Sequence, residues 1–247
     1  MKIFTLFFLL LSVLNAGSIT IAVAANVSYA IEDLKNAFKI QHPEIKVQTI
    51  LGSSGKLTAQ ITHGAPYGML LSANMLYPQT LYKTHLAITP PKVYAQGQLA
   101  YLSNKNRDFT LGMNLLLNKN ISKIAIANPK TAPYGKATKE ALKNAKIYKK
   151  IKPKLIYGES IAQTLFFTTK AADIGIVAKS SLYSKHMQNF KENTQWKTVN
   201  RSLYTPINQG IVLLKYAEGN REYRLFYDFI LSHKAKSIFE QYGYSVL

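Results

Sequence analysis

The chain of 247 residues contains no cysteine and only 12 acidic residues against 31 lysines and arginines. Without cysteine there is no disulfide scaffold, no thiolate-ligated metal, no thiol nucleophile and no lipid on an N-terminal cysteine. Charged residues make up 17% of the chain and hydrophobic residues 47%, a balance that excludes a disordered protein. The length is sufficient for one large or two modest domains with a true core.

The formal net charge of +19 predicts a negatively charged partner. Charge alone does not distinguish a nucleic acid from a membrane surface or a small anion. Nucleic-acid-binding proteins favour arginine for bidentate contacts, whereas this chain has only Arg107, Arg201, Arg221 and Arg224. Its lysines are spread along the sequence, as on a solvated surface. We therefore expect no nucleic-acid partner.

Residues 1–18 are typical of a secretory signal peptide. Lys2 precedes about a dozen mostly apolar residues, Ile3 to Leu14, which small residues follow. The apolar run is shorter than the roughly 20 residues that span a bilayer. We predict cleavage near Ala16 or Ser18, and a mature protein without a membrane span because no later stretch is long enough.

The remaining chain alternates between strand-like and helix-like segments. Apolar, β-branched runs predict strands, and apolar residues repeating every three or four positions predict helices. We expect strands at 19–24, 45–51, 69–71, 124–127, 154–157, 174–177 and 209–215, and helices at 30–40, 57–63, 136–142, 160–168, 226–231 and 235–242. The strand–helix–strand–helix–strand order at 19–71 implies a parallel sheet with crossover helices, and the pattern recurs at 124–177. Two such halves without a flexible linker predict two lobes and a cleft.

The sequence has none of the common catalytic motifs: no G-x-S-x-G, no P-loop, no G-x-G-x-x-G and no H-E-x-x-H. No two of its five histidines stand at ligand spacing. Glu32 and Asp33 are adjacent, so on a helix they diverge by about 100°. Glu159 beside Ser160 is more typical of a helix start than of catalysis. We therefore expect a protein that is not an enzyme and uses no cofactor.

Polar residues occupy the predicted junctions where a strand or loop passes into a helix: Asn26, Ser53-Ser54, Tyr134-Gly135 and Ser160. Helix N-termini carry unpaired N–H groups and a partial positive charge. Open α/β sheets bind ligands at such ends. Each residue could simply cap its own helix. Converging across a cleft, they would instead form an anion site made of neutral donors.

Motifs at and around these junctions are, in order, Ala24-Ala25-Asn26, Gly52-Ser53-Ser54-Gly55-Lys56-Leu57, Gly64-Ala65-Pro66, Leu71-Ser72-Ala73-Asn74, Asn128-Pro129, Ala132-Pro133-Tyr134-Gly135, Gly175-Ile176-Val177 and Phe239-Glu240-Gln241-Tyr242-Gly243-Tyr244. As a set they resemble the periplasmic molybdate-binding proteins of ABC transporters. The resemblance implies an α/β, two-lobe type II periplasmic binding protein fold with the ligand cleft between the lobes. It assigns residues 19–97 plus 207–247 to lobe 1 and residues 98–206 to lobe 2.

By motif position, the resemblance implies that Asn26, Ser54, Tyr134 and Ile161 hold a tetrahedral oxyanion. Asn26 follows the first strand, and Ser54 supplies a hydroxyl. Tyr134 and Ile161 contribute backbone N–H groups. The only metal would be that of the oxyanion itself, held through the same residues.

Three positions depart from the family pattern. Some members carry a tyrosine ligand after Gly-Ile-Val, where this chain has Ala178. The acidic residues usual at two further motif positions are replaced by Gly68 and Asn74.

We therefore expect an exported, monomeric protein that captures molybdate or tungstate in a Gram-negative-type periplasm and delivers it to an inner-membrane ABC permease. A receptor for sulfate or another oxyanion is the alternative on the same fold. An exported enzyme or adhesin is the alternative from a different class. A donor-only site disfavours protonated anions. Because the motifs hold no carboxylate acceptor apart from Glu159, phosphate ranks below molybdate and tungstate.

Overall fold

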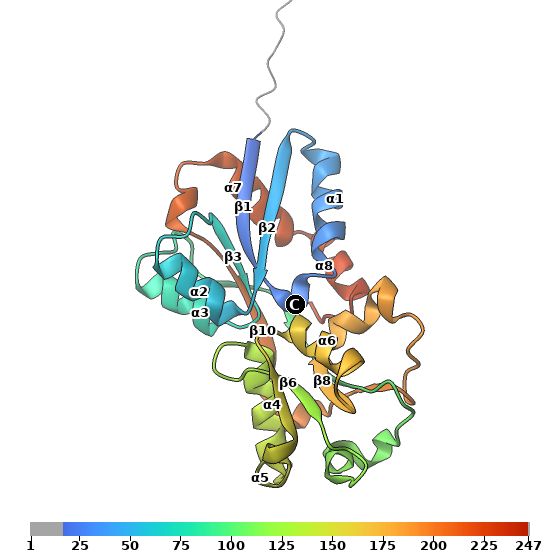
Figure 1. The fold of residues 1–247 in the computed structure, drawn as a ribbon. Coiled ribbons are helices and arrows are strands. Elements are labelled where there is room, and N and C mark those ends of the chain that lie inside the picture. The colour runs from blue at the N-terminus through green and yellow to red at the C-terminus, as the bar shows by residue number, and fades with distance from the viewer. Residues whose placement is uncertain (1–16, 247) are drawn as a thin grey trace, which may run out of the picture.

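The computed structural model describes residues 17–246, which form two lobes, each built on its own five-stranded sheet (Figure 1). The predicted signal peptide lies outside the described residues, apart from Gly17 and Ser18. Those two residues belong to the first strand, which therefore begins two positions earlier than the sequence predicts.

The first lobe contains strands β1 (Gly17–Ala24), β2 (Ile45–Gly52), β3 (Met69–Ser72), β4 (Lys92–Gly97) and β10 (Ile207–Leu213), and helices α1 (Ile31–Gln41), α2 (Ser54–Thr62), α3 (Leu76–Lys83), α7 (Arg221–Ile230) and α8 (His233–Gln241). Its sheet has the order β2-β1-β3-β10-β4. β1 runs parallel to β2 and β3, whereas β10 is antiparallel to β3 and β4. The three strands that the sequence predicts to be parallel, β1, β2 and β3, are parallel, and the antiparallel β10 makes the whole sheet mixed.

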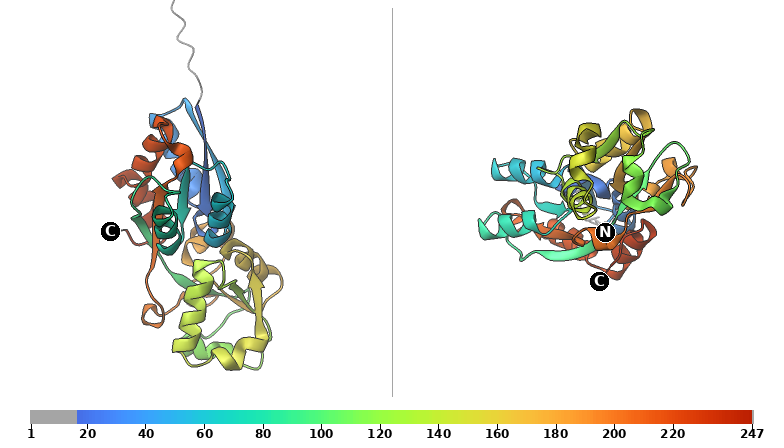
Figure 2. Two further views of the ribbon diagram at one scale, coloured as in Figure 1. Left: turned by 90° about the vertical axis from the view of Figure 1, so that its left-hand side faces the viewer. Right: turned by 90° about the horizontal axis from the view of Figure 1, so that it is seen from below.

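The second lobe contains strands β5 (Leu99–Leu102), β6 (Ile124–Ala127), β7 (Leu155–Gly158), β8 (Ile174–Ala178) and β9 (Trp196–Thr198), and helices α4 (Pro133–Asn144), α5 (Tyr148–Ile151) and α6 (Ile161–Lys170). The order β7-β6-β8-β5-β9 repeats the pattern of the first lobe, with β5 as the reversed strand. The chain crosses between the lobes after β4 and returns before β10. A side view shows the lobes stacked end to end (Figure 2).

Two helices begin three residues earlier than the periodicity predicts. α2 starts at Ser54 and not at Leu57, and α4 starts at Pro133 and not at Lys136. Proline suits the first turn of a helix because its fixed φ is already helical and the N–H it lacks would have no partner there. The earlier starts place α2 directly after β2, and α4 after the loop of residues 128–132 that follows β6.

Each lobe has its own apolar core. In the first lobe, the ring of Phe38 on α1 packs edge-on against Phe226 of α7, with 4.9 Å between centroids. The core of the second lobe also takes in Ala24, Ala25 and Ala73 from the first lobe. The two lobes are therefore in apolar contact around the ends of β1 and β3. Among residues 17–246, no helix is both long and apolar enough to cross a bilayer.

Candidate functional site

Four helix N-termini meet where the two lobes touch: those of α2, α4, α6 and the short 3-10 helix η1 (Ala25–Val27) that follows β1. They surround a small cavity lined by Ala24, Ala25, Asn26, Gly52, Ser53, Ser54, Ala73, Ala132, Pro133, Tyr134 and Ile161. Its volume of ≈ 10 Å³, measured as the space open to the centres of water-sized spheres, corresponds to about one such sphere. The structure thus brings together all four residues implied by the resemblance: Asn26, Ser54, Tyr134 and Ile161.

The first lobe lines this cavity with two buried serines. The Ser54 hydroxyl oxygen accepts the Ala73 N–H at 2.9 Å, so its own proton remains available. Ser53 occupies the N-cap position of α2 but makes no capping hydrogen bond. Its buried hydroxyl has no hydrogen-bond partner among residues 17–246. Two hydroxyl donors are therefore available beside the cavity, of which the family resemblance implies a ligand role only for Ser54.

The side chain of Asn26 is oriented differently from the expectation. Its Nδ2 donates to Gln209 Oε1 at 2.7 Å and to the Tyr244 hydroxyl at 2.9 Å. Its buried Oδ1 has no partner within the described part of the chain. The backbone carbonyl of Asn26 accepts the hydroxyls of Ser180 and Tyr244. Gln209 supplies the acceptor that turns the Asn26 amide hydrogens away from the cavity.

The second lobe offers mainly apolar side chains to the cavity, together with the first N–H groups of α4 and α6. The first four N–H groups of a helix have no partner within it. The Tyr134 hydroxyl is itself engaged, because it accepts the Gln209 Nε2–H at 3.2 Å. Burial and the neighbouring hydroxyls of Tyr244 and Tyr94 raise the pKa of Tyr134 well above 10, so its hydroxyl stays neutral. Tyr134 and Ile161 can therefore contribute backbone donors.

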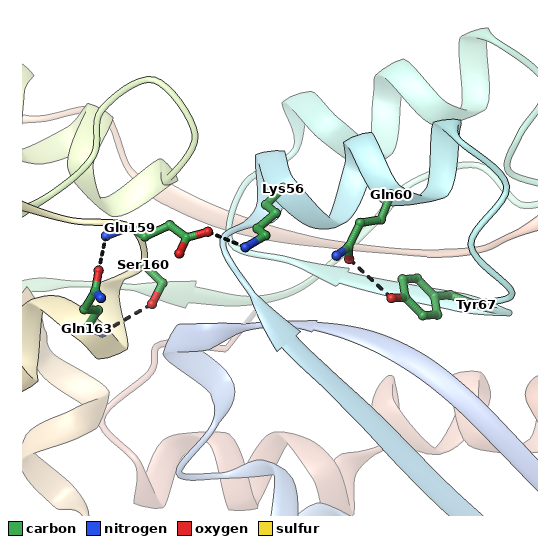
Figure 3. Close-up of polar contacts among 6 residues, drawn as sticks. All are labelled: Lys56, Gln60, Tyr67, Glu159, Ser160 and Gln163. Atoms are coloured by element: carbon green, nitrogen blue, oxygen red, sulfur yellow. Dashed lines mark hydrogen bonds and ion pairs between the residues drawn. The ribbon is translucent and has the colours of Figure 1, made fainter.

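Ser160, the fourth polar junction, does cap its helix. Its hydroxyl accepts the Gln163 N–H at 3.2 Å, and the Gln163 side chain in turn accepts the Glu159 N–H at 2.6 Å (Figure 3). This reciprocal arrangement resembles a capping box and fixes the chain just before Ile161. For Ser160, the capping interpretation is therefore the right one.

Charged groups stay at the margin of the site. Among the described residues, no charged side chain lines the cavity, and no cluster of His, Asp or Glu could hold a metal ion. Glu159 instead forms an ion pair of 2.5 Å with Lys56 across the two lobes (Figure 3). Its carboxylate is therefore engaged outside the cavity. The site consists of neutral dipoles, which favour a small anion.

The N-terminus of α2 contacts the second lobe directly. The Gly55 N–H donates to the Thr131 carbonyl of the second lobe at 2.9 Å. A Cβ at Gly55 would lie 2.8 Å from that carbonyl oxygen and 3.1 Å from the Thr131 Cα. Glycine is therefore needed here for the N-terminus of α2 to touch the opposite lobe.

The three departures from the family pattern all lie outside the cavity lining. Ala178 ends β8 and is buried. A Cβ at Gly68 would meet the Tyr223 ring at 2.3 Å, so glycine leaves room for that ring. Asn74 Oδ1 accepts the Tyr77 N–H at 3.4 Å near the start of α3. Gly68 and Asn74 therefore have local structural roles.

Comparison with known proteins identifies the family. A family model described as bacterial extracellular solute-binding protein matches residues 19–245. The chain belongs to this family. Two curated relatives of this solute-binding protein are the molybdate-binding proteins ModA of Azotobacter vinelandii and Rhodobacter capsulatus, each 33% identical to it. The alignments cover 94% of this chain and 91% of the first relative, and 93% of this chain and 88% of the second.

Solved structures agree with the family assignment. The periplasmic molybdate-binding protein of Azotobacter vinelandii matches this solute-binding protein with a TM-score of 0.83 at 26% identity, covering 93% of this chain and 99% of that one. The sulfate-binding protein SubI of Mycobacterium tuberculosis H37Rv shares the fold, with a TM-score of 0.78 at 13% identity, covering 94% of this chain and 87% of that one. The predicted two-lobe α/β fold and the resemblance to molybdate-binding proteins are both confirmed.

Proposed function

We propose that this solute-binding protein captures molybdate or tungstate and delivers it to an ABC permease of the inner membrane. The observation that carries the proposal is the small cavity at four helix N-termini, lined by neutral groups from both lobes. The identity to two molybdate-binding proteins over most of the chain supports the same ligand class. Asn26, Ser54, Tyr134 and Ile161 are the proposed ligands, and Ser53 joins them.

A site of neutral donors suits transport because it can be taken apart. Donors from opposite lobes contact the same anion, so separating the lobes removes about half of them in one step. Binding then shifts the equilibrium toward the closed state by the difference in affinity between closed and open forms. The anion can therefore be captured and then released at the permease by lobe movement alone, without a change in the protonation or charge of the site.

Selectivity would follow from the same donors. A hydroxyl or backbone N–H accommodates a fully ionised oxyanion, whereas a protonated anion needs an acceptor for its hydrogen. Glu159, the one carboxylate considered for that role, is paired with Lys56 outside the cavity. This favours molybdate, tungstate or sulfate over phosphate, and cavity size would separate the first two from sulfate.

Export and a monomeric state belong to the same proposal. β1 begins at Gly17, which pairs with Ile45 of β2. Cleavage after Ala16 would leave this strand whole, whereas cleavage after Ser18 would remove two of its pairs. The two lobes that line the cavity belong to the same chain, and we propose that the protein binds its ligand as a monomer. We propose that the mature protein acts in the periplasm.

A thermal-shift screen of oxyanions tests the proposed function. At 100 times its dissociation constant, a ligand adds about 2.7 kcal/mol to the free energy of unfolding. For a chain of this size, the midpoint should rise by about 5–10 °C. We expect molybdate and tungstate to give this shift and sulfate at equal concentration to give none. An equal shift with sulfate would favour the sulfate-receptor alternative.

A further inference from the structure

Gln209 on β10 connects the predicted ligand Asn26 to the opposite lobe through a fully buried amide. Its Oε1 accepts both Asn26 Nδ2 at 2.7 Å and the Tyr94 hydroxyl at 2.8 Å. Its Nε2 donates to the Tyr134 hydroxyl of the second lobe at 3.2 Å. Every direct partner of this amide is therefore another amide or a tyrosine hydroxyl.

In this arrangement, Asn26 presents the wrong end of its amide to an anion. Asn26 lines the cavity, and its Nδ2 is turned to Gln209 and Tyr244. The end left for the cavity is Oδ1, a buried acceptor without a partner among the described residues. A fully ionised oxyanion only accepts hydrogen bonds, so it would be repelled by this oxygen.

The network can be reversed if the two amide groups turn over, which exchanges the oxygen and nitrogen of each amide and leaves the other heavy atoms in place. The two ends of an amide have nearly the same shape, and a tyrosine hydroxyl can donate or accept. With both amides turned over, Gln209 Nε2 would donate to Asn26 Oδ1 and to Tyr94. Tyr134 would donate to Gln209 Oε1, and Tyr244 would donate to Asn26 Oδ1.

The reversed network satisfies the groups that the turn affects. Tyr94 can direct its proton to the Ser72 carbonyl, 3.3 Å away. The Asn26 carbonyl loses Tyr244 as a donor but keeps the Ser180 hydroxyl at 3.0 Å. The one new feature is that Asn26 Nδ2 points into the cavity as a donor.

We propose that Gln209 is a positioning residue whose amide turns over together with that of Asn26 when an anion binds. The inference rests on the proposed function and names the residue that controls the polarity of one ligand. Gln209 touches Tyr134 as well, so this reversal also changes a hydrogen bond between the lobes. Anion charge and lobe contact are thereby coupled through one buried side chain.

Nuclear magnetic resonance of the labelled side-chain amides tests this directly on the mature protein. Without anion, the Nε2 protons of Gln209 should show cross-peaks to the Tyr134 ring. With saturating molybdate, these should give way to cross-peaks to Tyr94. Unchanged cross-peaks in a protein that binds molybdate by calorimetry would overturn this inference and leave the proposed function intact. No calorimetric binding at all would overturn both.

A matched pair of variants gives a second test. Gln209→Met keeps the side-chain length but removes one of the two hydrogen-bonding partners of the Asn26 side-chain amide, the other being Tyr244. We expect its molybdate affinity to fall about tenfold, the equivalent of one net hydrogen bond. Gln48→Met removes an exposed amide from strand β2, where Gln48 accepts the Thr20 hydroxyl within the same lobe, and should change affinity less than twofold. An unchanged affinity for Gln209→Met would overturn the proposal. If that variant does not fold, the resonance experiment decides.

Discussion

The two halves of the cavity are built in different ways. The first lobe contributes polar side chains, namely the hydroxyls of Ser53 and Ser54 and the amide of Asn26. The second lobe contributes Ala132, Pro133, Tyr134 and Ile161, whose side chains are apolar or engaged elsewhere. Its donors are therefore backbone N–H groups at two helix starts.

This difference separates what the sequence specifies from what the fold specifies. In the first lobe, the proposed ligand groups are side chains, so a single substitution can remove one of them. In the second lobe, many residues could occupy the same positions, because the donor is the peptide group. Substitutions should accordingly have large effects on one side of the cavity and small effects on the other, unless they remove the N–H itself.

The largest effect should come from Asn26→Asp. The new carboxylate would lie against the bound dianion in a buried site, where like charges repel strongly. We expect molybdate affinity measured by calorimetry to fall more than about a hundredfold. Asn36→Asp makes the same change of charge at an exposed position of α1 and should leave affinity almost unchanged. Equal losses of affinity in the two variants would indicate that binding depends on the net charge of the protein and not on the side chain at position 26.

The next effect should come from the serines. Ser54→Ala removes a hydroxyl donor and leaves the buried Ala73 N–H without its acceptor. We expect binding to weaken by about 1–3 kcal/mol, together with a lower unfolding temperature. Ser53→Ala should weaken binding to a similar degree without this loss of stability, because its hydroxyl has no partner within the described residues. Ser237→Ala, at an exposed site on α8, is the control. Unchanged affinity in Ser53→Ala would remove Ser53 from the site.

The second lobe needs a different substitution. Ile161→Pro removes the N–H at the first position of α6, where proline is tolerated. The preceding residue, Ser160, is already extended at φ −130° and ψ 169°, as a residue before proline prefers. We expect binding to weaken by about 1–2 kcal/mol, whereas Ile161→Val keeps the N–H and should bind normally. Equal affinities of the two variants would show that this N–H does not touch the anion.

Comparison of Ser53 with Ser160 shows how far the sequence could predict the site. Both serines precede a helix and both have extended backbones, yet only Ser160 caps its helix. The residue pattern predicts the junctions correctly because N-cap preferences are local. Whether a hydroxyl turns to its own helix or to a cavity depends on the opposite lobe, which local sequence does not reveal.

In the fold, too, features set by local sequence were predicted, and features set by partners distant in the sequence were not. The apolar runs predict seven strands to within two residues at each end: β1, β2, β3, β6, β7, β8 and β10. They miss β4, β5 and β9, which pair with strands distant in sequence. The reversed direction of β10 follows from the two crossings between the lobes. Gln209 was missed for a related reason: its partners come from three separate parts of the chain.

The smallest effect should be that of the ion pair that joins the two halves at the surface. Lys56 and Glu159 side chains are 54% and 57% exposed, so solvent screens their attraction. Lys56→Glu places two carboxylates across the cleft and should weaken molybdate binding about two- to fivefold at low salt. Adding Glu159→Lys should restore most of the affinity, and high salt should abolish both effects. The same exchange at Arg224 and Asp228, paired within α7, should change affinity at neither step. Without rescue by the double exchange, the pair would have no role in holding the lobes together.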